Sequence, residues 1–208
     1  MTELIDNTLQ LFIVVVCGIY SGMSALKNRS YSWLFVTLFY LSFGIGLTYW
    51  VLYIILFAST PRVFCVSELS WTASYIFLAI RLAAELSDEE RNYKPKLAWA
   101  LPLFSLGMCI FFCQRGSYLE NILMGAALAV CGFLAARGLM FAIAQNRTKR
   151  RYICMAVLIF IAAEYLLWVS SYFWLSDTFF NPYFLMDTFV LNPALILVAI
   201  MQKREDRA

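Results

Sequence analysis

Three acidic residues lie within long apolar stretches of this 208-residue chain: Glu68, Glu164 and Asp187. A charged side chain in a membrane-spanning helix is costly and usually faces the interior of a helix bundle or a wet cavity. At about 1.5 Å per helical residue, Glu68 and Asp187 are expected roughly 8 Å below the outer surface and Glu164 near mid-depth. Carboxylates in such places predict a site for a small polar or cationic solute.

Aromatic residues share helix faces with two of these carboxylates. Trp71 lies three residues after Glu68, and Trp168 lies four residues after Glu164, so the members of each pair are neighbours on one helix face. Tyr49, in the preceding apolar stretch, is expected at a corresponding position on the inner face of its own helix. Because aromatic faces stabilise cations by roughly 0.5 to 2 kcal/mol each, we predict an acidic and aromatic cavity open to the outside. Its predicted lining is Glu164, Asp187, Glu68, Tyr49, Trp71 and Trp168.

A simpler interpretation stays open for the two shallower carboxylates. Glu68 and Asp187 can snorkel to the outer interface, where tryptophan and tyrosine also form belts. Glu164 is too deep to do this easily, so we expect it to face the bundle interior, either at a functional site or in a contact that locks helices together. The pair Asn192-Pro193 is expected to interrupt the helix just after Asp187, because proline cannot donate a backbone hydrogen bond.

Membrane-spanning helices must position these residues. The hydrophobic fraction is 62% and the mean hydropathy is +0.74. A bilayer core needs roughly 20 helical residues to cross it, and helices satisfy their own backbone polar groups in lipid. We therefore predict an all-α polytopic membrane protein, one domain over residues 1–208 with seven transmembrane helices. The expected spans are 4–26, 33–57, 63–82, 97–113, 121–143, 152–174 and 183–201.

Basic residues cluster in alternate connections between these spans. Positive charge near span ends marks the cytoplasmic side, so we predict an N-terminus outside, a cytoplasmic C-terminus and a place in the plasma membrane. The basic residues are expected to face lipid headgroups. Arg81 and Arg137 lie near cytoplasmic span ends, where we expect snorkelling, with pairing to Glu85 or to anionic lipid as the alternative. The clustered basic residues are Lys27, Arg29, Lys94, Lys96, Arg147, Lys149, Arg150, Arg151, Lys203, Arg204 and Arg207.

The first three spans align with the last three. Tyr49 matches Tyr165, Glu68 matches Asp187, and a Cys-Gly pair occurs at 17–18 and again at 131–132. A single span between two triplets makes both triplets begin outside, as parallel repeats do. Our hypothesis is that residues 4–84 and 119–203 are parallel three-helix repeats joined by a linker helix at 97–113.

This three-plus-one-plus-three layout resembles the architecture of the SWEET and PnuC small-solute transporters. The order of seven spans from outside to inside also resembles rhodopsin-like receptors. The resemblance implies architecture only, because the chain has neither a Pro-Gln pair in the first span of each triplet nor a lysine in the last span that would hold retinal. No functional residue is carried over from these families.

The chain contains no histidine, which removes the usual parts for haem ligation, most zinc hydrolases and histidine-relayed catalysis. We expect no cofactor, no metal and no nucleic-acid partner, and the residues do not assemble an enzyme's nucleophile, base and orienting group. A transporter or permease for a small polar or cationic solute is the leading hypothesis. The alternatives are a sensor or receptor module that signals to a cytoplasmic protein partner, and an accessory membrane subunit without its own ligand.

Overall fold

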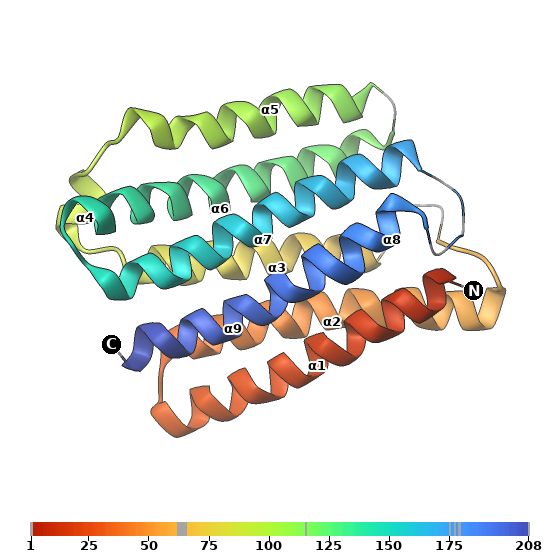
Figure 1. Cartoon of the computed structure of the whole chain (residues 1–208), viewed down its shortest axis with the longest axis horizontal. Coiled ribbons are helices and arrows are strands. Elements are labelled where there is room, and N and C mark those ends of the chain that lie inside the picture. Colours follow the sequence, from red (N-terminus) through yellow and green to blue (C-terminus); the bar gives the residue numbers. More distant parts are fainter. Residues whose placement is uncertain are drawn as a thin grey trace.

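Helices account for the secondary structure in the computed structural model, which describes residues 2–61, 66–114, 116–174, 176, 178 and 180–207. The long helices run side by side in an elongated bundle (Figure 1). They are α1 (Thr2–Asn28), α2 (Tyr31–Phe57), α3 (Val66–Ala84), α5 (Ala100–Cys113), α6 (Tyr118–Ala144), α7 (Thr148–Phe173) and α9 (Asn192–Arg207). Shorter elements are α4 (Asp88–Asn92), a 3-10 turn (Lys96–Trp99), α8 (Pro182–Met186) and a π-helical turn (Asp187–Leu191).

Six helical segments are long and apolar enough to cross a membrane: Thr2–Asn28, Tyr31–Phe57, Lys96–Cys113, Tyr118–Ala144, Thr148–Phe173 and Pro182–Asp206. Large apolar side chains are exposed along these segments, as lipid contact requires. The prediction of a multi-pass helical membrane protein is therefore confirmed for six of the seven expected spans.

The expected third span is the helix that falls short of this apolar character. Helix α3 has a polar inner face, on which Ser67, Glu68, Thr72, Ser74 and Arg81 are all buried. It nevertheless lies within the bundle beside α2 and contacts α6 (Figure 1). Neighbouring helices thus shield its polar residues. The hydropathy of a single helix does not take such shielding into account.

Six of the long helices form a ring. Contacts between neighbours follow the order α1, α2, α3, α6, α7 and α9, and α9 returns to contact α1. Helix α5 lies outside this ring against α6 (Figure 1). Inside the ring, the Phe160 ring of α7 lies 5.3 Å from Phe39 of α2 and 5.9 Å from Tyr75 of α3, centre to centre. These aromatic residues fill the middle of the bundle.

Local sequence signals explain several helix boundaries. The Ser30 hydroxyl accepts a hydrogen bond from the backbone at the start of α2, and Ala58 ends that helix in a left-handed conformation. Ser87 caps α4, and Asn181 caps α8 with Pro182 in the first helical position.

The expected interruption at Asn192-Pro193 is confirmed as a π-helical turn. The backbone N–H of Asn192 donates to the carbonyl of Asp187, five residues back, instead of the usual four. Proline has no N–H and clashes with the preceding turn, which favours this widening just before Pro193. The turn therefore sets the place of Asp187 within the bundle.

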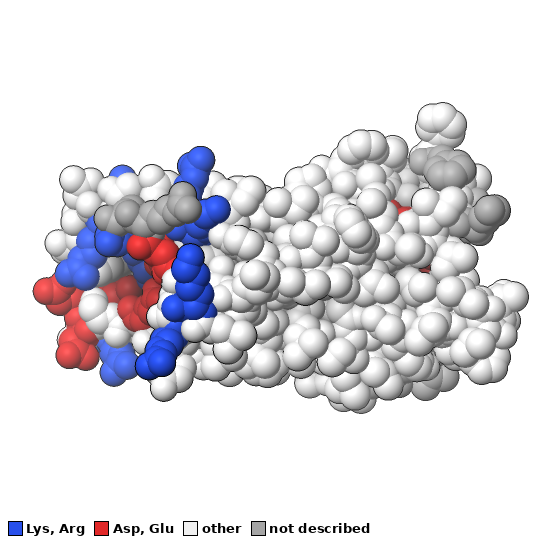
Figure 2. Space-filling view, turned by 90° about the horizontal axis from the view of Figure 1, so that it is seen from below, with Lys and Arg blue, Asp and Glu red and all other residues white. Residues whose placement is uncertain are grey.

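Charged side chains concentrate at one end of the molecule, here called the basic end. It is the end at which α1 and α9 finish and α2 and α7 begin. Figure 2 shows lysine, arginine and most of the visible acidic side chains there, with only small acidic patches in the other half. Arg62 and Arg115 belong to the alternate connections that carry few basic residues, and both lie outside the described residues. The membrane side that the basic end faces stays a prediction from the positive-inside rule.

Candidate ligand-binding site

A cavity of about 190 Å³ lies inside the ring, away from the basic end. Helices α1, α2, α3, α6, α7 and α8 and the π turn all contribute to its walls. Lysine and arginine are absent from the described residues that line it. Its acidic residues are Glu68, Glu120, Glu164 and Asp187, and its other polar and aromatic residues include Asn7, Gln10, Phe43, Trp50, Trp71, Tyr75, Trp168, Ser171 and Tyr183.

The four cavity carboxylates come from four different elements: α3, α6, α7 and the π turn. Glu68, Glu164 and Asp187 are only 7%, 5% and 1% exposed. The alternative in which Glu68 and Asp187 snorkel to the outer interface is therefore wrong, because neighbouring helices cover both side chains. Buried carboxylates close to one another resist simultaneous ionisation unless a cation or a proton joins them.

Glu164 points into the bundle, as predicted. Its Oε1 is buried without a hydrogen-bond partner among the described residues, and the Tyr75 hydroxyl of α3 hydrogen-bonds its carboxyl group. The Ser171 hydroxyl lines the same cavity, whereas Thr48 is exposed and donates to the Gly44 carbonyl. An unsatisfied buried oxygen costs roughly 1 to 3 kcal/mol, so the Glu164 carboxyl favours a ligand that donates to it.

Tryptophan rings form two walls of the cavity. Trp168 stacks on Phe112 of α5, with ring centres 4.7 Å apart and planes 13° apart. Trp71 packs against Trp50 at 5.6 Å, and its indole N–H is buried without a partner among the described residues. Helix α2 carries Gly46 at this contact, where an added Cβ would lie 2.8 Å from the Trp71 nitrogen. The glycine thus allows the Trp71 ring to approach α2 closely.

Tyr49 is the one predicted site residue that does not line the cavity. Its ring lies 5.9 Å from the ring of Tyr53, and the side chain is half-buried. The next residue, Trp50, lines the cavity instead and donates to Glu3 of α1 at 3.0 Å. One residue along a helix turns the side chain by about 100°, so this difference is one of helix rotation.

Sequence reasoning missed the polar residues near two helix starts. Asp6 lies within the expected first span but was not named as a site residue, and Glu120 lies one residue before the expected fifth span, whereas α1 begins at Thr2 and α6 at Tyr118. Both residues are therefore helical. The available signal was the spacing of Glu3, Asp6, Asn7 and Gln10, which puts polar groups three or four residues apart on one face of α1.

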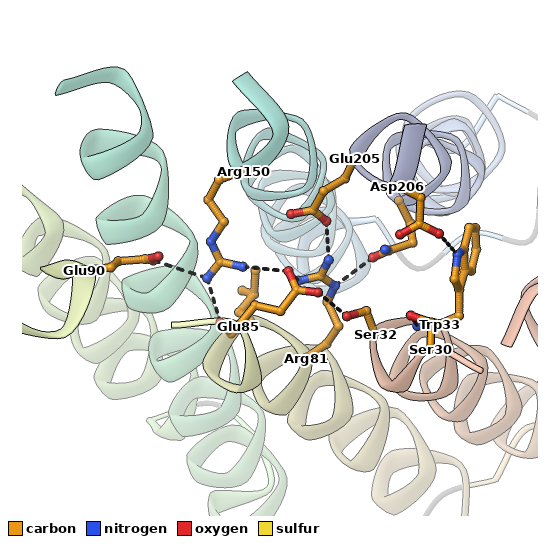
Figure 3. A network of polar contacts seen from close by, with 11 residues as sticks. Ser30, Ser32, Trp33, Arg81, Glu85, Glu90, Arg150, Glu205 and Asp206 are labelled. Carbon is orange, nitrogen blue, oxygen red and sulfur yellow. Dashed lines mark hydrogen bonds and ion pairs between the residues drawn. The ribbon is translucent and has the colours of Figure 1, made fainter. Parts of the chain in front are cut away.

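A second buried polar cluster lies at the basic end and is here called the arginine network: Arg81, Glu85, Glu90, Arg150, Gln202 and Glu205 (Figure 3). Arg81 of α3 is fully buried. It donates to Gln202 at 2.7 Å, to Glu85 at 2.9 Å and to Glu205 of α9. The expectation that Arg81 snorkels is wrong, and the alternative pairing with Glu85 is confirmed, because the last helix extends far enough to cover the guanidinium.

Arg150 of α7 joins two further elements to the arginine network. It donates to the Leu82 carbonyl at 2.7 Å and to Glu90 of α4 at 3.2 Å (Figure 3). Beside the network, the Trp33 indole donates to Asp206, which links α2 to α9. These bonds tie α2, α3, α4, α7 and α9 together at the end of the ring that lies away from the cavity.

The arginine network changes the pKa of Glu85, which lies just after α3 and outside the membrane-spanning segments. Burial alone would raise its pKa, but the Arg81 guanidinium, the Ser32 hydroxyl and Arg150 outweigh that effect and lower the pKa below the usual 4.5. Arg137 takes no part in the network. It is half-buried, with its guanidinium 5.5 Å from the Phe133 ring centre.

No protein family model, curated protein or solved structure matches this chain. Among the described residues, no group of three or more cysteine and acidic side chains is placed to hold a metal ion. Fold and site together define a multi-pass helical membrane protein that encloses an acidic and aromatic cavity.

Proposed function

We propose that the protein binds a small cationic solute in this cavity and carries it across the plasma membrane as a transporter or permease. The observation that carries the proposal is the composition of the lining, in which four carboxylates and three tryptophans occur without a lysine or arginine among the described residues. Carboxylates supply charge and hydrogen-bond acceptors, while aromatic faces attract a weakly hydrated cation. An amine or quaternary ammonium group fits both kinds of neighbour.

The order of the helices supports a transporter with seven spans, made up of the six apolar segments and α3. Helices α1 to α3 are consecutive in the ring, as are α6, α7 and α9, and α5 stays outside as a linker would. This order is compatible with parallel three-helix repeats, and transporters built from such repeats bind solute at the interface between the repeats. The cavity takes residues from both triplets, including Glu68 from the first and Glu164 from the second.

The two ends of the ring support an outward-facing state. Between the cavity and the basic end lie the aromatic residues around Phe160 and then the arginine network. By the positive-inside rule, the basic end is cytoplasmic and the cavity belongs to the outer half. Release to the cytoplasm would require these layers to open.

Binding and flux measurements on reconstituted protein test the proposal. Tryptophan fluorescence reports occupancy, since Trp50, Trp71 and Trp168 line the cavity, and uptake of small primary amines or tetramethylammonium into proteoliposomes reports transport. Glu164→Gln should weaken binding of these probes at least about tenfold, which corresponds to 1.4 kcal/mol. The matched control is Glu89→Gln, an exposed carboxylate at the basic end, which should bind like the wild type.

The possible outcomes separate the alternatives. Binding and flux that are both lost in Glu164→Gln support a transporter. Binding without flux overturns transport and supports a sensor or receptor module that signals to a cytoplasmic partner. If none of the cationic probes changes the fluorescence of the wild type, the binding proposal is refuted.

A further inference from the structure

Two buried aspartates meet where α1 crosses the π turn beside the cavity. Asp6 is 5% exposed and Asp187 is 1% exposed. The Thr188 hydroxyl donates to Asp6 Oδ1 at 2.7 Å, and the Gln10 amide donates to Asp187. The two carboxyl groups are within hydrogen-bonding reach of each other. Each aspartate is thus held by a residue from the other's element and faces the other aspartate.

Among the described residues, no basic group lies beside this pair to allow both aspartates to ionise. The titratable groups described around it are Glu3 on α1, Glu164 on α7 and Tyr183 on α8, all of them acids. Asp6 Oδ2 is buried and, among the described residues, has no donor to satisfy it. Two carboxylates repel each other, whereas a carboxylic acid donates a hydrogen bond to a neighbouring carboxylate. A single shared proton therefore satisfies both the charge and the unpaired oxygen.

We propose that Asp6 and Asp187 form a proton-binding site, and that this proton is exchanged for the cationic solute. This inference rests on the proposed function. Asp187 also lines the cavity, so a cation that enters neutralises its charge and removes the need for the proton. One proton then leaves for the outside as one monovalent cation binds, and the net charge of the site is unchanged. The reaction class is proton–cation antiport.

The place of the pair also gives the proton a mechanical effect. The hydrogen bonds of Asp6 and Asp187 join α1, in the first triplet, to the segment that leads into α9, in the second. That segment is already widened by the π turn, and both polar atoms of the Asn192 side chain are buried there without partners among the described residues. Loss of the proton weakens this hydrogen-bonded contact between the triplets. The contact lies next to the π turn, where the polar atoms of Asn192 can then find new partners.

The first test needs no ligand. Infrared difference spectra of purified wild type against Asp6→Asn should show the carbonyl stretch of a protonated carboxylic acid at neutral pH, present only in the wild type. Asparagine keeps the shape of the protonated aspartate and can still accept from Thr188, so the variant should fold; elution as a single species and thermal unfolding check this. A wild-type spectrum without this band overturns the proton site, whatever the protein binds.

The second test measures protons and occupancy in one sample. In weakly buffered solution with a pH-indicator dye, saturating tetramethylammonium should release about one proton per cation bound to the wild type. Asp6→Asn should still bind, as seen by tryptophan fluorescence, but release none, while the Glu89→Gln control should release as much as the wild type. Wild-type binding without proton release refutes the antiport and leaves the proposed binding function standing. Binding that requires sodium instead replaces the proton site with a sodium site.

Discussion

Arg81→Met should destabilise the protein strongly, because it removes the centre of the arginine network while filling most of the same space. Arg81 is fully buried, and the Glu205 side chain that it contacts is 10% exposed. Removing one partner of a buried ion pair costs about 3 to 5 kcal/mol, since the other charge is left uncompensated. Glu85 adds less, because its side chain is 35% exposed and solvent screens the pair.

Thermal unfolding in detergent micelles, followed by tryptophan fluorescence, measures this loss. For a chain of about this size, each kcal/mol shifts Tm by roughly 2 to 4 °C, so we expect a decrease of about 6 to 20 °C. Arg91→Met is the matched control. Arg91 is 63% exposed and its nearest carboxylate oxygen, on Asp88, is 3.9 Å away, so this change should alter the free energy of unfolding by less than about 0.5 kcal/mol.

A double variant distinguishes loss of the ion pair from loss of packing. Arg81→Met with Glu205→Gln removes the stranded carboxylate, so it should recover part of the lost stability. If the single variant unfolds at the wild-type temperature, the buried ion pair does not stabilise the fold. If the double variant is less stable than the single one by the full cost of a second substitution, the stranded charge was not the cause.

Three further predictions follow from other parts of the molecule. Because folding lowers the pKa of Glu85 from its usual 4.5, its contribution to stability is present above that pH and is lost as the pH falls through the lower folded value; Glu85→Gln should therefore lower Tm at pH 7 and flatten its decline in acid. The Tyr40 hydroxyl is buried and donates to the Leu195 carbonyl at 2.5 Å, so Tyr40→Phe should cost about 1 to 3 kcal/mol in urea unfolding; an unchanged midpoint would contradict this contact. Finally, in a variant without native cysteines, an impermeant thiol reagent applied to intact cells should label a cysteine at the exposed Ser176 and not one at the exposed Gln145; the reverse pattern would invert the membrane orientation.

Apolar stretches predicted the long helices well, because a helix in lipid satisfies its own backbone whatever its neighbours are. Helix ends were less predictable, since hydropathy does not mark the residue at which a helix begins; Glu120 was missed for this reason, whereas Asp6 was missed because no local pattern links it to Asp187. Choosing Trp50 over Tyr49 required the rotation of α2, which depends on contacts with α1 and α3. The partners of Arg81 were out of reach for a similar reason, because Gln202 and Glu205 belong to a stretch that reads as a cytoplasmic tail.

Glu164 was predictable as an inward-facing residue because its depth leaves few alternatives. Its meeting with Tyr75 was not, since the two residues are far apart in the chain and no local pattern links them. The same limit applies to Asp6 and Asp187, which lie at opposite ends of the sequence. Contacts between helices depend on the order of the ring, and the sequence offered only the weak repeat as a guide to that order.

The polar inner face of α3 has a consequence for how the chain is made. The ribosome delivers α3 to the membrane before α6, α7 and α9. These later helices pack beside α3 or cover its polar side chains. Until then Arg81 has neither Gln202 nor Glu205 beside it, and a charged residue in an unshielded span inserts poorly. The early part of the chain should therefore wait at the insertion machinery, and the last helix should complete assembly. A nascent chain stopped before Asn192 should be recognised by quality-control proteases, because it leaves a charged helix exposed to lipid.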